Sequence, residues 1–503
     1  MSKRPLVAPS PGALRSRSGA EVSFGSRRVG RSGVSLAMNM DTAPPAPAVQ
    51  ADRQVWGSAV AVGFKTISEG LEDAAERCKK QLGGAKPDVA FVFISSRYLE
   101  GRGGAQPASK SDLKAIIPKV QSLLGVRHVI GCTASGVLGT SEEDGSPEEF
   151  EDFKGVSLSA ARLPNVSIQP FRLNAKDLPD AMEGKQEEWR TKVKGPPEAD
   201  KPSFVVLSGQ AFSATGELNK LISGLDYAYS SAVKVGGISS GMVPGGVFCS
   251  DFEGGCVDSD AVGLCLSGDI EIQPIVAQGC RPVGGLFEVV ESKGNQVTMV
   301  MEIGKGKDST PCTPMAALKE VLQGLDEKDV TLAQSALLLG IASNSFKTVT
   351  PQEDLGPGDF LIRQVVGVVV KDGAFVIGDL IKPGQRFRFH LRDKEAAVAE
   401  AEALFSTYKR SRLEAMMTGK PSNGASGVVM FACNGRGRSL YNEENYDSRM
   451  AYLSTGVPVV GMFCNGEIGP IGSETHLHGF TSVFAVFRQA SAAKPSAPAP
   501  EES

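Results

Sequence analysis

Asp88-Val-Ala-Phe-Val-Phe-Ile-Ser-Ser96 and, after a helical segment, Val129-Ile-Gly-Cys-Thr-Ala-Ser-Gly136 are the stretches that decide the fold of this chain. In them an apolar strand ends in small polar residues, a helix crosses back, and a second apolar strand runs into a glycine turn. This order predicts a strand–helix–strand unit. Ligands of α/β sheets bind beyond the carboxyl ends of the strands, so the small polar residues at these ends are candidate site residues.

The same pattern occurs twice more along the chain. The second copy runs from Ser203-Phe-Val-Val-Leu-Ser-Gly209 to Val233-Lys-Val-Gly-Gly-Ile-Ser-Ser-Gly241. The third runs from Gly427-Val-Val-Met-Phe-Ala-Cys-Asn-Gly435 to Val457-Pro-Val-Val-Gly-Met-Phe-Cys-Asn-Gly466. Pseudo-symmetric halves built from this unit are predicted to place the repeated glycine turns on a common face of the fold.

Two landmarks indicate that the first and second copies arose by internal duplication. An Ile-Gln-Pro triplet begins at Ile168 and again at Ile272, 104 positions later. The glycines that open the preceding turns, Gly131 and Gly236, are 105 positions apart. Nearly equal offsets at independent positions are typical of repeats. We therefore expect residues 56–275 to form one domain made of two related halves.

Residues 276–488 show a different pattern of strands and helices and are predicted to form a second domain. Two hairpin turns are expected, at Lys293-Gly-Asn295 and at Asp372-Gly373, each between runs of β-forming residues. A long amphipathic helix is expected over residues 393–410 before the third unit begins. The whole chain is therefore predicted to be a mixed α/β fold, with strand–helix–strand units alternating with hairpins and layered sheets with helices outside.

The two ends of the chain differ in composition from the rest. Residues 1–50 hold seven Lys or Arg and two acidic residues, are rich in Ser, and end in an Ala/Pro-rich segment. That composition is typical of an organellar transit peptide and predicts a chloroplast location, with mitochondrion or cytoplasm as alternatives. Residues 489–503 are Ala/Pro-rich and predicted to be disordered. The remaining body is acidic, which argues against a nucleic-acid partner.

Cysteine and histidine usage limits the kinds of site that the chain could hold. The chain has nine cysteines without a Cys-x-x-Cys pair, which favours free thiols in a reducing compartment. Only His476 and His478 of the four histidines are close in sequence, so no metal site is expected. No cofactor motif is recognised. No apolar run reaches the roughly eighteen residues of a membrane span.

Two loops of the third copy carry the clearest candidate ligand-binding groups. Asn434 and Arg436 follow one apolar strand, in a glycine-rich turn where Arg436 could clamp a carboxylate. Glu467 follows the next strand and could bind an ammonium group or act as a base. An Arg and a Glu on adjacent loops would suit a zwitterion such as an amino acid. The structural alternative is a surface turn whose charges pair with neighbouring residues.

Further candidates lie elsewhere in the chain. Arg363 stands inside an apolar strand and needs either a protein carboxylate or a ligand anion as its partner. Ser95, with its neighbour Ser96, ends the first strand, where a hydroxyl could line a pocket or cap the following helix. Cys132 and Thr133 stand in the first glycine turn, where they could line the same pocket. A catalytic set around Cys132 cannot be assembled from the sequence, and no catalytic residue is assigned.

Together these motifs resemble the FIST (F-box and intracellular signal transduction) family over residues 56–488, covering both its N and C regions. The resemblance rests on the order of these motifs: Phe93-Ile-Ser-Ser-Arg97, Gly131-Cys-Thr-Ala-Ser-Gly136, Gly236-Gly-Ile-Ser-Ser-Gly241, Phe360-Leu-Ile-Arg363, Cys433-Asn-Gly-Arg-Gly437, Cys464-Asn-Gly-Glu-Ile-Gly-Pro470 and Leu477-His-Gly-Phe-Thr481. It implies a small-ligand-binding sensory module whose ligand is an amino acid or a small carboxylate.

The resemblance also leaves alternatives to a sensor open. In some eukaryotic members the family module is fused to an F-box and acts as a ubiquitin-ligase adaptor, but no helical segment for an F-box is expected between residue 50 and the first strand. A stand-alone sensor with an unidentified output protein is therefore the preferred interpretation. The first alternative is a protein-interaction adaptor. The second is a hydrolase or transferase that uses a Cys or Glu of the same pocket.

Overall fold

The computed structural model describes most of the chain after its N-terminal segment. The described residues are 53–101, 106–180, 184–243, 245–252, 255–304, 310–343, 355, 357–418 and 423–490. The predicted targeting segment, residues 1–50, and nearly all of the predicted tail, residues 489–503, lie outside them. The mixed α/β fold is confirmed, with three sheets, a barrel and flanking helices.

The first sheet is built around the first strand–helix–strand unit, in which α2 (Lys110–Leu124) connects two parallel strands. Its five strands are, in spatial order, β1 (Val55–Val62), β6 (Gly155–Arg162), β2 (Val89–Ser95), β3 (His128–Ala134) and β10 (Val247–Cys249). A second helix, α1 (Ile67–Leu82), connects β1 to β2. It begins at a reciprocal cap between Thr66 and Glu69 and ends at Gly83, which has a left-handed φ of 57°.

The second sheet is built in the same way around α5 (Glu217–Ala228). Its strands are, in spatial order, β7 (Val166–Asn174), β11 (Asp260–Gly268), β8 (Ser203–Ser208), β9 (Lys234–Ile238), β21 (Glu467–Ile471) and β22 (Glu474–His478). Two shorter helices, α3 (Gln186–Lys192) and α4 (Gln210–Ala214), lie before and after β8 in the chain.

The third sheet is built around α10 (Tyr446–Thr455), which with the short helix α9 (Arg438–Tyr441) connects its two parallel strands. Its strands are, in spatial order, β12 (Glu271–Ala277), β23 (Ser482–Arg488), β19 (Ala425–Cys433), β20 (Val459–Cys464), β4 (Gly136–Thr140) and β5 (Pro147–Phe150). The preceding helix α8 (Lys394–Met417) is the predicted long helix; Asp393 caps its start, and it runs past residue 410 to Met417.

All three sheets share one pairing pattern, and each receives one or two strands from another unit. An edge strand pairs antiparallel with a second strand, which pairs antiparallel with the parallel pair of the unit. The strand beyond the parallel pair comes from a different unit. The first unit gives β4 and β5 to the third sheet, the third gives β21 and β22 to the second sheet, and the second gives β10 to the first sheet. The three units are therefore interlocked in a closed cycle.

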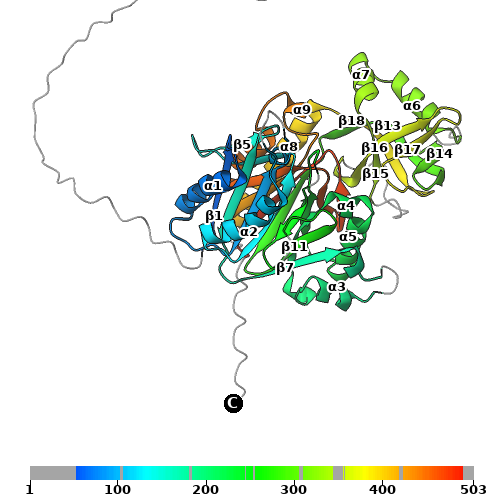
Figure 1. Ribbon diagram of the computed structural model, residues 1–503. Coiled ribbons are helices and arrows are strands. Elements are labelled where there is room, and N and C mark those ends of the chain that lie inside the picture. The colour runs from blue at the N-terminus through cyan, green and yellow to red at the C-terminus, as the bar shows by residue number, and fades with distance from the viewer. Residues whose placement is uncertain are drawn as a thin grey trace, which may run out of the picture. The chain divides into compact units, whose positions relative to one another are not determined.

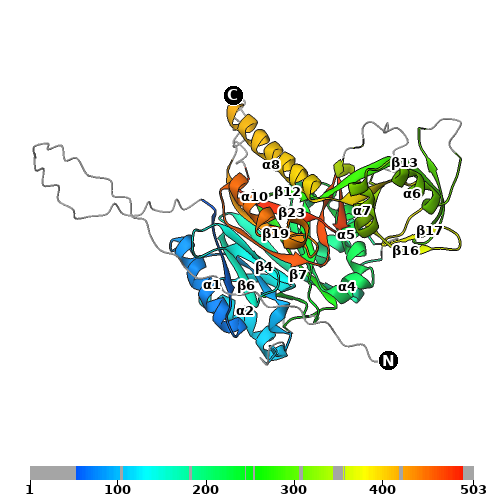
Figure 2. The same cartoon turned by 90° about the horizontal axis from the view of Figure 1, so that it is seen from above.

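The inner faces of the three sheets form one shared core. Phe91 of the first sheet, Val205 of the second and Phe431 of the third belong to the same buried cluster. The outer faces pack on helices, with α1 and α2 on the first sheet, α3 and α5 on the second, and α8 and α10 on the third. Figures 1 and 2 show these helices outside the strands. The predicted division at residue 275 stays a prediction, and strands from both sides of it share the second and third sheets.

A closed six-stranded barrel lies in the chain between β12 and α8, so it interrupts the third repeat (Figure 1). Its strands are, in spatial order, β13 (Cys280–Lys293), β14 (Gln296–Glu302), β17 (Ala374–Ile377), β16 (Phe360–Val369), β15 (Leu337–Ala342) and β18 (Arg386–Arg392). Both predicted hairpins are present, as β13–β14 and β16–β17. The helices α6 (Pro314–Gln323) and α7 (Glu327–Ala336) precede β15. No helix in the described ranges is long and apolar enough to cross a membrane.

Candidate functional site

One glycine in each unit fixes how the three copies correspond. Gly131, Gly236 and Gly461 lie opposite Val92, Val206 and Met430 in their parallel strand pairs. A Cβ atom added to these glycines would lie 1.9, 1.8 and 2.1 Å from the carbonyl oxygen of the opposite residue. Only glycine fits such a close backbone approach. The three positions are therefore structurally equivalent.

This register places corresponding residues of all three units at the carboxyl ends of their strands. Ser96, Gln210 and Asn434 each stand four residues beyond the partner of the close glycine. On the second strand of each unit, the position four residues beyond the glycine itself holds Ser135, Ser240 or Asn465. Both sets consist of hydroxyl and amide side chains, which can donate and accept hydrogen bonds.

These strand ends surround one pocket of about 420 Å³. Every unit contributes to its lining, which consists of Ser96, Arg97, Glu100, Ser135, Glu151, Asp152, Gln210, Gly241, Met242, Asn434, Phe463 and Asn465. The volume lies in the range of natural small-molecule sites. The predicted common face of the glycine turns is thus where the pocket lies, because the strand exchange brings the three units together there.

Hydrogen bonds between units hold the pocket wall together. Ser135 donates its N–H to Ser240 Oγ at 2.7 Å, and Ser240 Oγ donates to the carbonyl oxygen of Phe463 at 2.5 Å. Asn465 donates its N–H to the carbonyl oxygen of Ile238 at 3.1 Å. The Ser135 hydroxyl also donates to Asn434 Oδ1. An amide oxygen does not take a proton at neutral pH, so this arrangement supports hydrogen bonding to a ligand rather than activation of Ser135 as a nucleophile.

The charged side chains of the pocket all come from the first unit and the loop after β5. Arg97 donates to Glu100 Oε2 at 2.6 Å and to Asp152. Burial opposes the charge of Arg97, but these two carboxylates raise its pKa above the usual value. Burial raises the pKa of Glu151, whose Oε1 accepts the N–H of Arg438 at 2.7 Å. Among the described residues, three carboxyl groups and one guanidinium therefore line the pocket.

Among the residues predicted from the sequence, Asn434 lines the pocket. Ser95 is buried one residue before the pocket-lining Ser96, and its hydroxyl donates to the carbonyl oxygen of Phe153 at 2.7 Å. Thr133 is also buried, and its Oγ1 accepts the N–H of Gly246 at 3.0 Å. Ser95 and Thr133 therefore support the wall of the pocket from behind.

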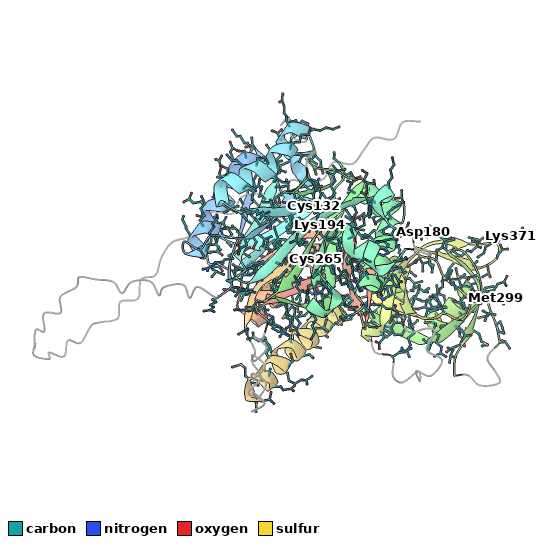
Figure 3. The ribbon with its side chains drawn as sticks, turned by 90° about the horizontal axis from the view of Figure 1, so that it is seen from below. Cys132, Asp180, Lys194, Cys265, Met299 and Lys371 are labelled. Atoms are coloured by element: carbon teal, nitrogen blue, oxygen red, sulfur yellow. The ribbon has the colours of Figure 1, made fainter. Side chains whose placement is uncertain are left out.

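Cys132 belongs to the shared core rather than to the pocket lining. Its side chain is fully buried, and its Sγ lies 3.1 Å from Sδ of Met462, one position after the close glycine of the third unit. Burial raises the pKa of the Cys132 thiol well above its usual value. In Figure 3 the labelled Cys132 lies among the strands of the body. These surroundings fit a packing role.

Arg436, expected to clamp a ligand carboxylate, is occupied by an internal one. It is fully buried and donates from Nε to Asp447 Oδ2 at 2.7 Å and from Nη2 to Asp447 Oδ1 at 3.0 Å. It also donates to the carbonyl oxygen of Ala277 at 3.1 Å and to the hydroxyl of Tyr441. It does not line the pocket. The structural alternative for Arg436, pairing with a protein carboxylate, is the one that the geometry supports.

Arg363, like Arg436, has a carboxylate partner within the protein. It lies on β16 of the barrel, where its Nε donates to Asp379 Oδ2 at 2.6 Å. A second donor, Nη1, bonds the carbonyl oxygen of Ile362 at 2.9 Å. Arg363 therefore has the protein carboxylate that a half-buried guanidinium requires, and the structure does not bring it to the pocket lining.

Glu467 is fully buried beneath the strand ends of the third unit. Its Oε1 lies 3.4 Å from Cys464 Sγ, and its Oε2 accepts the N–H of Thr481 at 3.2 Å. Burial raises the pKa of Glu467 from its usual 4.5 to about 8, so the carboxyl is protonated at neutral pH. The expected pairing of Arg436 and Glu467 around a zwitterion is not what the geometry shows, since neither lines the pocket.

Glu467→Gln is expected to weaken the pH dependence of stability. The folded carboxyl binds a proton up to about pH 8, whereas the unfolded one releases it near pH 4.5. Stability from this group is complete below pH 4.5 and falls as pH rises towards 8, by up to about 1.4 kcal/mol per pH unit. Urea unfolding of both proteins from pH 5 to pH 8.5 measures the slope. Glu187→Gln, whose side chain is 78% exposed, is the control. An unchanged slope in Glu467→Gln would contradict the assignment.

Most of the residues that line the pocket were not predicted from the sequence. Arg97, Gln210 and Asn465 were not selected, nor were Glu151 and Asp152. Two of them could have been found from the sequence. When the three copies are aligned on their close glycines, Gln210 falls at the position of Asn434, and Asn465 falls at the position of Ser135. Glu151 and Asp152 reach the pocket only through the exchange of β4 and β5 into the third sheet. Across the described ranges, no group of three or more His, Cys, Asp or Glu side chains is arranged to hold a metal ion.

Comparison with protein families finds two matching domain models. The FIST N domain matches residues 88–302, and the FIST C domain matches residues 314–470. Both matched ranges contribute to the pocket, since Ser96 and Gln210 lie in the first and Asn434 lies in the second.

The similar proteins and one solved structure say less about this chain than the two domain models do. An uncharacterised protein of Mycobacterium bovis is 33% identical over 215 residues, which are 42% of this chain and 50% of that protein. One from Mycobacterium tuberculosis is 34% identical over 214 residues, with the same coverage of 42% and 50%. The chain thus spans about half the length of the curated relatives it matches. A cyanuric acid hydrolase from A. caulinodans aligns with a TM-score of 0.27 and 9% identity, over 86% of this chain and 99% of that one, which is too weak to support an inference.

Proposed function

We propose a function on the premise that this chain belongs to the FIST family, whose domains are associated with signal transduction and small-ligand sensing. It binds a small polar molecule, an amino acid or another small compound with an ammonium or carboxyl group, in the pocket between its three units. Binding is passed to a separate output protein, in the chloroplast if residues 1–50 act as the expected targeting segment.

The observation that carries this proposal is the composition of the pocket wall. Ser96, Gln210 and Asn434 come from three units that are far apart in sequence, and they meet at one cavity of about 420 Å³. A ligand that bonds all three would change the free energy of their relative arrangement. Because strands of one unit pair into the sheet of another, a ligand-induced shift at one strand end would also strain a neighbouring unit's sheet. That is the property required of a sensor.

Thermal unfolding against a panel of amino acids, amines and small carboxylates is expected to reveal a stabilising ligand. A compound present at one hundred times its dissociation constant adds about 2.7 kcal/mol to the free energy of unfolding. Gln210→Ala removes one wall residue and is expected to weaken binding about tenfold, which is about 1.4 kcal/mol less stabilisation.

Gln364→Ala is the matched control, because Gln364 is an exposed glutamine on β16 of the barrel. Stabilisation should be the same in this variant as in the unchanged protein. If no compound stabilises the protein at concentrations well above millimolar, the sensor proposal fails. Ligand-independent co-purification with a ubiquitin-ligase scaffold would then support the adaptor alternative.

A further inference from the structure

The charged groups of the central pocket are unbalanced in sign. Glu100, Glu151 and Asp152 are carboxyl groups, whereas Arg97 is the one cation among the described residues that line it. The other polar lining groups are hydroxyls and amides, which are neutral. A cavity lined mainly by one sign of charge concentrates ligands of the opposite sign.

The single cation is already compensated by groups of the pocket itself. Arg97 donates from Nη1 to Glu100 Oε2 at 2.6 Å and from Nη2 to Asp152. The Arg97 side chain is 19% exposed and that of Glu100 is 8% exposed, so this pair is largely withdrawn from solvent. A ligand carboxylate would have to displace a protein carboxylate from Arg97. Bidentate capture of an anion is therefore disfavoured at this guanidinium.

Glu151 is a carboxyl group at the pocket wall that is not paired with Arg97 in the way Glu100 and Asp152 are. Its Oε1 accepts the backbone N–H of Arg438 at 2.7 Å, which holds the carboxyl group at the pocket wall. An ionised carboxylate has two oxygens and accepts several hydrogen bonds, so acceptor capacity remains for a donor in the cavity. An ammonium group has three donors and no acceptor. It complements Glu151, Asp152 and the amide oxygens of the wall.

From this arrangement we infer that the pocket takes a net cationic amine, anchored by its ammonium group at Glu151 and Asp152. The inference rests on the proposed ligand-binding function and narrows it. The cavity of about 420 Å³ is much larger than a bare metal ion, and its neutral hydroxyl and amide groups suit a small organic amine. A carboxyl group on the ligand is not needed for binding and lowers the affinity.

Three compounds on one five-carbon skeleton test the sign of charge directly. The dication 1,5-diaminopentane, the zwitterion 5-aminopentanoate and the dianion glutarate have closely similar length and flexibility. Calorimetric titration of the full chain at low salt is expected to rank them in that order, with at least tenfold between the dication and the dianion. Added salt should weaken the dication most, because screening reduces attraction between separated charges.

Two variants locate the binding group. Glu151→Gln keeps the acceptor for Arg438 while removing the charge, and Asp152→Asn keeps the shape. Each variant is expected to bind 1,5-diaminopentane at least fivefold more weakly. Its affinity for glutarate should stay nearly the same or increase. Glu187→Gln, on an exposed carboxyl of α3 that does not line the pocket, is the control and should leave all three affinities unchanged.

The outcomes separate the two proposals. Glutarate or the zwitterion binding more tightly than the dication, with Gln210→Ala still weakening that binding, would overturn the cation inference and leave the sensor proposal standing. Dication binding that is unaffected by Glu151→Gln and Asp152→Asn would also overturn it. Binding of none of the three compounds, together with no hit in the wider panel, would overturn both.

Discussion

Gly461→Ala and Gly131→Ala are expected to prevent the chain from folding to a stable state. A Cβ at Gly461 would lie 2.1 Å from the carbonyl oxygen of Met430, and one at Gly131 would lie 1.9 Å from that of Val92. The opposing atom is backbone in a central parallel strand pair, so no side chain can move aside. We expect a loss of more than 4 kcal/mol or no soluble protein. Yield and urea unfolding midpoints measure the effect.

Gly367→Ala is the control for these two substitutions. Gly367 also lies in a strand, β16, but the nearest atom to an added Cβ there is Cβ of Val376 at 3.9 Å, an ordinary contact. A change of less than about 1 kcal/mol is expected, in keeping with substitutions that meet no strain. If Gly461→Ala were as mild as Gly367→Ala, the close parallel approach that aligns the three units would be wrong.

Arg436→Met is expected to be the most damaging change among the charged residues. Among the described residues, it leaves the fully buried Asp447 with Tyr441 and Ser482 as its hydrogen-bond donors. Burial opposes the charge of Asp447, and Arg436 is the main group that lowers its pKa below the usual value. Removing one partner of a buried ion pair costs about 3–5 kcal/mol. Urea unfolding at neutral pH measures this loss.

A second substitution, of Asp447, distinguishes the loss of the ion pair from the cost of leaving one buried charge without a partner. Arg436→Met combined with Asp447→Leu is expected to recover part of the lost stability, because no buried charge then remains unpaired. The exposed pair of Arg449 and Glu443, 3.7 Å apart, serves as the control, and Arg449→Met should cost less than about 1 kcal/mol. Equal effects of Arg436→Met and Arg449→Met would contradict the buried role of Arg436.

The local elements of the fold were predictable because their signals are local. Three apolar strand pairs with glycine turns, hairpins at Lys293-Gly-Asn295 and Asp372-Gly373, and the long helix α8 all depend on neighbouring residues. The exchange of β4, β10 and β21 between sheets was not predictable, because these short strands carry no mark of their partner. Closure of β13 to β18 into a barrel likewise depends on long-range pairing.

The site shows the same division between local and long-range information. Asn434 was identified because it follows an apolar strand and stands in a glycine turn. Arg436 shares those local features, yet its partner Asp447 lies on α10. The sequence spacing did not indicate that these two residues would pair with each other and leave Arg436 unavailable to a ligand. Glu467 was selected as a group that could bind a ligand ammonium, but strand β21 carries it into the second sheet and buries it.

A crystal structure with the strongest binder from the panel tests most directly whether ligand binds where the three units meet. We expect ligand density in contact with Ser96, Gln210 and Asn434, one residue from each unit. Density in the barrel, or in contact with residues of a single unit only, would contradict it.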